Sequence, residues 1–170
     1  PYYTFHGTAR VKRHTHSGKL DNFEKISEGF AELTAHCKDR GVTLCLENVE
    51  WSTYNRPGVF SRIAERGPDL RGVLDIKQAR ISQFPYEEYL TEMGEKLAYA
   101  HISDLDGNGK IRLPGQGDFD FETLIKRLKD VGFQGALLVE VYKDDYTDVQ
   151  ELKVACEYVN ALLYKLNCLG

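Results

Sequence analysis

The chain has 170 residues, of which 42% are hydrophobic and 28% charged, a composition that excludes a disordered, collagen-like or coiled-coil protein. Lysine and arginine number 22 against 26 acidic residues, and the net charge of -4 argues against a broad surface for nucleic acid or anionic membrane. No linker or sequence repeat divides the chain, so we expect one domain. Its length is well short of the roughly 250 residues of a complete (β/α)8 barrel.

Short apolar segments alternate with amphipathic stretches, which is typical of a parallel sheet whose strands are joined by helices. Each apolar segment lacks a polar face, as buried parallel strands do. The predicted strands cover residues 2–6, 42–47, 72–75, 97–103 and 136–142.

Segments with helical periodicity lie between these strands. Pro57 and Pro85 predict the starts of two helices, the first running through Ile63. Asp120 can cap a third helix, and Thr147 with Gln150 has the spacing of a capping box before the last one. The apolar residues that share a helical face are Ile26, Phe30, Leu33 and Cys37, in a helix that ends near Gly41; Tyr86, Leu90, Met93 and Leu97; Phe121, Leu124, Leu128 and Val131; and Leu152, Cys156, Val159, Leu163 and Leu166.

The four cysteines show no C-x-x-C spacing. Cys37 and Cys156 fall on predicted helix faces and Cys45 in an apolar strand, so we expect buried free thiols in a reducing cytosol. The sequence contains no secretory signal and no run of 18 apolar residues that would predict export or membrane insertion. We therefore expect a cytoplasmic protein.

Residues that can bind a metal ion or transfer a proton stand at or near the end of every predicted strand. Loops that leave the carboxyl ends of parallel strands converge, so we expect these side chains to share one site. Charged residues are common where strands meet solvent, but five such ends in one chain favour the shared site. The residues are His6, Glu47, Asp75, His101 and Glu140.

Two glutamates, an aspartate and a histidine make an oxygen-rich ligand set at Glu47, Asp75, His101 and Glu140. Such a set suits a hard or borderline divalent ion, Mn2+ first, with Mg2+, Co2+ or Zn2+ as alternatives. The ion would act as a Lewis acid on a polyol or keto sugar and stabilise the enediolate formed when a carboxylate removes a proton next to the carbonyl.

Two folds fit this alternation of strands and helices. An open, flavodoxin-like sheet of five strands would be complete within 170 residues. It would not readily bring five strand ends around one ion, whereas a closed curve does. The sequence therefore predicts an α/β fold of the (β/α)8 TIM-barrel type, in a partial barrel.

Five segments carry a resemblance to the xylose isomerase-like TIM barrel superfamily, which includes sugar-phosphate isomerases, ketose 3-epimerases, inosose dehydratases and endonucleases for abasic sites in DNA. The similarity spans nearly the whole chain and implies that it supplies about the last five βα units, with the N-terminal units missing. The segments are TFHG at 4–7, GVTLCLENV at 41–49, GVLDIKQA at 72–79, AYAHISD at 98–104, and the block 113–142 that leads to Glu140.

The resemblance also implies roles for individual residues. The metal ligands of the family fall on the same four positions, and in the ketose epimerases the two glutamates, here Glu47 and Glu140, form the acid/base pair. His6 takes the place of a histidine that binds substrate or additional metal in some members. Members often carry a histidine over the substrate where this chain has Gln78, preceded by Lys77, which weakens the epimerase assignment.

Other residues near the strand ends have a functional and a structural interpretation. Trp51 could stack on a sugar face or pack within its loop. Arg112, in a glycine-rich loop, could cover a substrate phosphate or belong to a lid. Lys77 could bind an acidic substrate or pair with a ligand carboxylate. Asn48 could orient Glu47 or begin a turn. Asp104 could support His101 or cap a turn, and the His14-x-His16 pair is more typical of a solvated loop.

We therefore expect a divalent-metal-dependent isomerase or epimerase of a small sugar or sugar phosphate. Alternatives are a dehydratase or lyase on the same site, a non-catalytic sugar-binding protein, and an abasic-site endonuclease. The last is disfavoured because residues 105–118 lack the extra histidine that such enzymes carry. We expect no membrane partner and allow a homo-oligomer. A partial barrel would expose an edge strand at residues 2–6, so we also expect a fragment, or another segment or chain that covers this edge.

Overall fold

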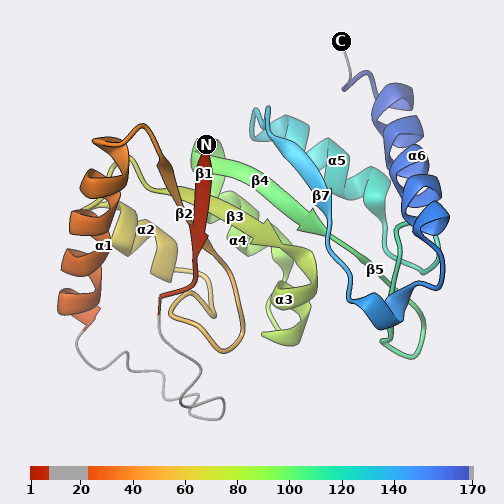
Figure 1. The fold of residues 1–170 in the computed structure, drawn as a ribbon, viewed down its shortest axis with the longest axis horizontal. Helices are drawn as coiled ribbons and strands as arrows, with labels where there is room; N and C mark the ends of the chain where they lie inside the picture. The colour runs from red at the N-terminus through yellow and green to blue at the C-terminus, as the bar shows by residue number, and fades with distance from the viewer. Residues whose placement is uncertain (8–22, 169–170) are drawn as a thin grey trace.

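The computed structural model describes residues 1–7 and 23–168, so His14 and His16 lie outside the described residues. Its main sheet contains five parallel strands, which follow one another across the sheet in chain order (Figure 1). A doubly wound sheet reverses its strand order, so the flavodoxin-like alternative is wrong and the partial TIM-type barrel is confirmed. The strands are β1 (Tyr2–Phe5), β2 (Thr43–Glu47), β3 (Arg71–Asp75), β4 (Leu97–Ile102) and β7 (Ala136–Val139).

Helices fill the connections between these strands, and a short antiparallel hairpin follows β4. None of the helices in the described ranges combines the length and apolarity that crossing a membrane requires. The helical elements are α1 (Phe23–Lys38), α2 (Val59–Ala64), α3 (Ile76–Ile81), α4 (Tyr86–Met93), η2 (Gly94–Lys96), α5 (Phe121–Asp130), η3 (Lys143–Asp145) and α6 (Val149–Lys165), and the hairpin consists of β5 (Asp104–Leu105) and β6 (Ile111–Arg112).

The middle strands of the sheet are buried on both faces, as predicted. Leu44 and Leu46 of β2 belong to the large core shared with the helices, whereas Cys45, between them, packs on the other face against Val73. The two outer strands are less buried, because neither has a neighbour on its outer side in the described sheet. This exposure was expected for residues 2–6 but not for β7. Tyr2 of β1 is 61% exposed and Leu138 of β7 is 45% exposed.

Several predicted helix boundaries need correction. The helix after Pro85 ends at Met93, because Gly94 adopts a positive φ of 48°, and Leu97 begins β4 instead of extending the helix. The helix after Pro57 begins two residues later, at Val59. Asp148, not Thr147, caps the last helix, in a capping box with Glu151.

The last helix buries only part of the predicted stripe: Val159 is buried, and Leu152, Leu163 and Leu166 are partly buried. Ala155 and Val159 are its buried residues, and Cys156 is exposed, which contradicts the expectation of a buried thiol there. Cys37 and Cys45 are buried and free, as expected. The described sheet ends at β7, next to α6. One face of α6, which a further strand would cover, therefore remains partly exposed. Short helix α3, directly after β3, was not predicted.

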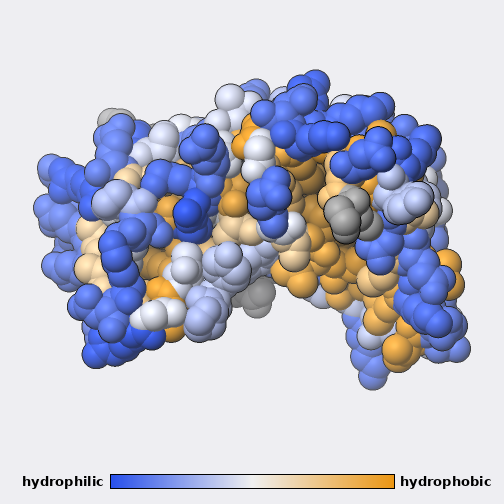
Figure 2. Space-filling view, turned by 90° about the horizontal axis from the view of Figure 1, so that it is seen from above, coloured by the Kyte–Doolittle hydropathy of each residue, from blue (hydrophilic) through white to orange (hydrophobic). Residues whose placement is uncertain are grey.

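The molecule has the shape of an arch, with apolar surface gathered in its hollow on the side of α6 (Figure 2). A groove of about 700 Å³ runs between β7, α5 and α6, lined by apolar side chains that include Leu137, Val139 and Leu163. Exposed apolar surface therefore collects where the sheet ends.

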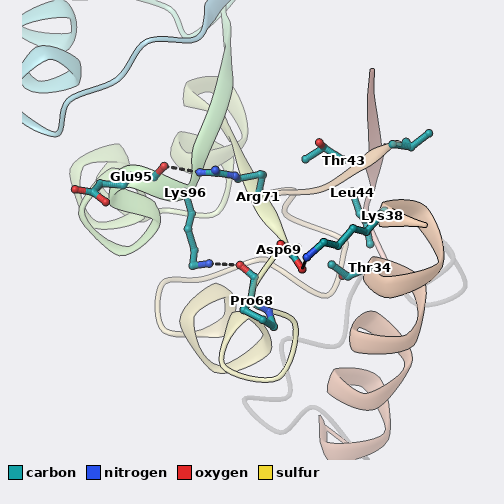
Figure 3. Close-up of a pocket in the computed structure, with 10 residues that line it drawn as sticks. Thr34, Lys38, Thr43, Leu44, Pro68, Asp69, Arg71, Glu95 and Lys96 are labelled. Atoms are coloured by element: carbon teal, nitrogen blue, oxygen red, sulfur yellow. Dashed lines mark hydrogen bonds and ion pairs between the residues drawn. The ribbon is translucent and has the colours of Figure 1, made fainter. Parts of the chain in front are cut away.

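Polar side chains hold the opposite, amino-terminal end of the strands. Lys38 forms an ion pair with Asp69, Arg71 donates to the carbonyl of Glu95, and Lys96 reaches the carbonyl of Pro68 (Figure 3). These cations surround a pocket, but each has a protein partner. We interpret these contacts as structural links between loops. The carboxyl ends of the strands remain as the expected position of a functional site.

Candidate metal centre

Four side chains with metal-binding atoms meet at the carboxyl edge of the sheet. Glu47 ends β2, Asp75 ends β3, His101 lies near the end of β4, and Glu140 directly follows β7. One ligand atom from each lies within 4.8 Å of the others. In the parallel register, Asp75 pairs with His101 and His101 pairs with Leu138, so the pleat directs alternate residues of neighbouring strands to the same face. The four residues that the sequence predicted as a ligand set thus lie together in the structure.

Glu47 lies at the centre of this cluster. Its Oε1 accepts a hydrogen bond from His101 Nδ1 at 2.7 Å, and its Oε2 accepts one from His6 Nε2, also at 2.7 Å. Burial would raise the pKa of Glu47, but the hydrogen bonds from His101 and His6 outweigh it and lower the pKa to about 2. Glu47 is therefore ionised and held at both oxygens.

Asp75 has the opposite electrostatic environment. Burial raises its pKa to about 7, and the nearby Glu140 carboxyl adds to this, although Lys77 acts against it. The pKa of His101 is also raised, because the attraction of Glu47 exceeds the effect of burial. Carboxylates this close together repel one another, so without a metal ion the cluster favours bound protons.

Asn48, for which the sequence left open an orienting role toward Glu47 or the start of a turn, is a positioning residue. Its side chain accepts a hydrogen bond from the backbone N–H of Asp75 at 2.7 Å and donates one to the Asp75 carbonyl at 2.8 Å. Asn48 follows Glu47 directly, so it fixes the end of β3 beside the end of β2. It therefore aligns two of the candidate ligands through the backbone of Asp75, rather than by contacting the Glu47 carboxylate.

Asp104 organises the loop above the strand ends. Its buried carboxylate accepts hydrogen bonds from the N–H groups of Leu105, Gly115, Gly117 and Phe119. This agrees with the interpretation of Asp104 as a turn cap, and it shows that Asp104 caps a whole loop instead of a single turn. The spacing of residues along the sequence cannot reveal this role, because the N–H groups come from positions up to 15 residues away from Asp104.

The residues predicted to contact substrate lie in two groups. His6 and Lys77 contact the cluster directly, and the ring of Trp51 meets the ring of His6 edge-on at 5.4 Å. Gln78 accepts from the backbone N–H of Glu50, and Arg112 pairs with Asp106 in the hairpin. The first group therefore borders the cluster with its side chains. Gln78 reaches the cluster through its backbone N–H, which donates to Asp75 Oδ1 at 2.9 Å, and the described side-chain contacts of Gln78 and Arg112 run to neighbouring loops.

Lys77 is almost fully buried beside the carboxylates. Its Nζ lies 3.2 Å from Glu140 and 3.7 Å from Asp75. The sequence left open whether Lys77 pairs with a ligand carboxylate or binds substrate, and the structure shows the pairing.

The profile of the family described as xylose isomerase-like TIM barrel matches residues 1–162 of the chain. The chain belongs to this family. Among curated proteins, it is 27% identical over 125 residues to fructoselysine 3-epimerase of Escherichia coli O157:H7, covering 69% of the chain and 45% of that protein. It is 24% identical over 144 residues to inosose dehydratase of Clostridium perfringens, covering 73% and 48%. The chain thus spans about half the length of these xylose isomerase-like relatives.

Solved structures of family members share the fold. D-psicose 3-epimerase of Clostridium cellulolyticum H10, solved with D-tagatose, superposes with a TM-score of 0.67 at 18% identity, covering 83% of this chain and 56% of that one. The IolI protein, whose structure holds a zinc atom, gives a TM-score of 0.68 at 21% identity, with 86% and 59% covered. At these identities the likeness establishes the xylose isomerase-like fold, and the activity is addressed below.

Proposed function

We propose that this chain carries the metal centre of a divalent-metal-dependent isomerase or epimerase acting on a sugar or sugar phosphate. One observation supports this most directly. Four ligand atoms converge within 4.8 Å, and two of them belong to glutamates on separate strands, β2 and the end of β7. Two carboxylates beside one ion are suited to moving a proton to and from a carbon next to a carbonyl.

The donor set fits a divalent ion. Three carboxylates and one imidazole are oxygen-rich, which favours Mn2+. Mg2+, Co2+ and Zn2+ are alternatives, and the zinc atom in the IolI structure keeps Zn2+ among them. When bound, the ion would supply Lewis-acid polarisation of a carbonyl or hydroxyl oxygen.

Glu47 and Glu140 are the proposed acid/base pair. Glu47 is held by two histidines, so its position is fixed before substrate arrives. The Glu140 side chain is 44% exposed and can meet a substrate from the open side. A proton removed by one carboxylate and returned by the other, on the opposite face of the carbon, would invert its configuration.

The proposed substrate contacts are His6, Trp51, Lys77, Gln78 and Arg112. His6 and Trp51 form one wall next to Glu47, where an aromatic ring can cover the apolar face of a sugar. Lys77 can contact a sugar oxygen from the side of Glu140. The side chains of Gln78 and Arg112 bond to Glu50 and Asp106, so for these two residues the proposal rests on their place in the sequence.

Proton exchange in D2O tests this function. The protein loaded with Mn2+ is incubated with a panel of ketoses and ketose phosphates, and NMR follows loss of the signal from the proton beside the carbonyl. Exchange on at least one ketose supports the proposal. With Mn2+ binding demonstrated separately, no exchange on any substrate would contradict it.

A dehydratase or lyase is the second candidate, favoured by the similarity to inosose dehydratase. The same base would remove the proton, but a hydroxyl group would then leave. The NMR experiment distinguishes the two reactions, because a dehydratase consumes the substrate and produces a new alkene or keto signal. Tight sugar binding that Glu140→Gln leaves unchanged would instead identify a non-catalytic sugar-binding protein. Cleavage of DNA at abasic sites would identify the less favoured endonuclease.

We also propose a cellular setting for the chain and a covering for its open side. All four cysteines are free, which supports a reducing, cytoplasmic setting. Exposed Tyr2 on β1 and Leu138 on β7 support a domain whose open side is covered by other polypeptide, either more of the same protein or a second copy. Light scattering after size-exclusion chromatography tests the second copy, and a strictly monomeric chain would count against it.

A further inference from the structure

The burial of Lys77 next to two carboxylates is the feature that the proposed function leaves unexplained. The Lys77 side chain is only 4% exposed. It leaves the first turn of α3, two residues after Asp75, and its Nζ reaches both Asp75 and Glu140. The amine lies within ion-pair distance of both carboxylates and is therefore an ammonium ion.

The charges of the site balance only when this ammonium is counted. Glu47, Asp75 and Glu140 together carry three negative charges, and a divalent ion neutralises two of them. His101 must be neutral to coordinate a metal, so it adds no charge. One uncompensated negative charge in a buried site is unfavourable, and Lys77 supplies the missing positive charge.

Lys77 also determines where Glu140 points. Glu140 follows the outer strand β7, and the backbone there is held by one hydrogen bond to the Ile102 carbonyl. Its half-exposed carboxylate is oriented by Lys77 at 3.2 Å and by His101 at 3.4 Å. The ring of Tyr142, two residues further along, lies 4.9 Å from Lys77 Nζ and covers the ammonium.

We propose that Lys77 is a built-in countercation of the metal centre and a positioning residue for Glu140. Before an ion binds, Lys77 holds together two carboxylates that would otherwise repel. After an ion binds, it remains beside them and balances the third carboxylate. This inference rests on the proposed function for the catalytic role of Glu140, but its claim about charge concerns the metal site alone.

The two effects of Lys77 on metal binding have opposite signs. Orienting Glu140 favours the ion, whereas the positive charge repels it at close range. The repulsion of a divalent ion by an ammonium ion in a partly desolvated site exceeds the gain from one ordered, half-exposed ion pair. Removing the charge of Lys77 should therefore tighten metal binding while impairing proton transfer.

The test measures Mn2+ binding by titration calorimetry, with no substrate present. Lys77→Met should bind Mn2+ about tenfold more tightly than wild type, because a nearby positive charge is gone. Lys77→Arg, which keeps the charge, should bind more like wild type than Lys77→Met does. Lys77→Gln also removes the charge and replaces Lys77→Met if that variant does not fold. Lys143→Met removes an exposed charge near the end of β7 and is the matched control, expected to change affinity by less than about twofold because salt screens it.

A second measurement tests whether Lys77 positions Glu140. In the D2O exchange assay at saturating Mn2+, the turnover rate of Lys77→Met should fall about a hundredfold, because Glu140 is misaligned, with a smaller change in KM. Tighter metal binding together with slower exchange is a combination that a purely structural lysine would not produce. Unchanged or weaker Mn2+ binding in both uncharged variants would overturn the proposal. If wild type exchanges no ketose, the proposed function fails, while the Mn2+ titration still decides the role of Lys77.

Discussion

The Nδ1 atom of His101 lies 2.7 Å from Oε1 of Glu47, although 54 positions separate the two residues in the sequence. The contact joins β4 to β2 across the intervening β3, because all three strands end at the same edge. It holds one oxygen of Glu47 while His6 holds the other. Glu47 is thus the residue on which the geometry of the whole cluster depends.

Replacing Glu47 by Gln should remove most of the metal affinity. The amide cannot supply the negative charge, and it cannot accept hydrogen bonds from both histidines at once. We expect Mn2+ binding to weaken by at least about 100-fold, measured by calorimetry. Glu32→Gln, an exposed residue of α1, is the control and should bind Mn2+ as wild type does. Wild-type affinity in Glu47→Gln would show that the ion binds elsewhere.

Replacing Glu140 by Gln should abolish proton transfer more than substrate binding. A neutral amide cannot take a proton, and general acid–base catalysis contributes about 10² to 10⁴ in rate. We therefore expect the exchange rate in D2O to fall by that factor, with Mn2+ at saturating concentration to offset the lost ligand. A rate within a few-fold of wild type would exclude Glu140 from the acid/base pair.

Metal binding should weaken as the pH falls below neutral. Without metal, the pKa of Asp75 is about 7 and that of His101 is raised, so protons compete with the ion at these ligands. Glu47, with a pKa of about 2, stays ionised and contributes no competition. Each displaced proton costs up to about tenfold in apparent affinity per pH unit. Calorimetry from pH 5.5 to 8.5, in two buffers of different ionisation enthalpy, counts the released protons. A flat affinity profile would be inconsistent with this environment for Asp75.

The metal-free chain should be most stable in mildly acidic solution. The raised pKa values of Asp75 and His101 contribute stability that is complete below their unfolded values of 3.8 and 6.5 and is lost as the pH rises through the folded values. The lowered pKa of Glu47 contributes stability above 4.5 that is lost as the pH falls towards 2. Urea unfolding with EDTA should therefore give a higher free energy of unfolding near pH 5 than at pH 8. Adding Mn2+ should stabilise the chain most at pH 8, and equal stabilisation at both values would argue against the prediction.

Replacing Gly117 by Ala should loosen the loop that Asp104 holds. A Cβ atom at position 117 would lie 2.2 Å from the Leu105 carbonyl oxygen and 2.5 Å from Oδ1 of Asp104. The loop must then move and leave the buried carboxylate with unpaired oxygens, which we expect to cost at least about 2 kcal/mol of unfolding free energy. At Gly107 a Cβ would meet only Asp118, at 3.6 Å, so Gly107→Ala is the control and should be tolerated. Thermal unfolding compares the two.

The sequence by itself was enough to predict the five parallel strands and the four residues that gather at their ends. Buried parallel strands consist of apolar runs, and a polar side chain directly after such a run stands out. Because the carboxyl ends of parallel strands share one edge, Glu47 and His101 could be placed near each other without any knowledge of their contact. The failures at Leu97 and Thr147 concern boundaries, where neighbouring residues offer nearly equivalent caps.

Only the tertiary structure decided which groups contact which. Asn48 forms two hydrogen bonds with the backbone of Asp75, and Asp104 accepts hydrogen bonds from N–H groups of a distant loop. Cys156 is exposed on α6, beside the edge where the described sheet ends at β7. For Lys77, the choice between pairing with a ligand carboxylate and binding an acidic substrate depends on the distance to Glu140, 63 positions away. Local periodicity carries no information about such distances, because they are determined by how strands and loops from remote parts of the chain pack together.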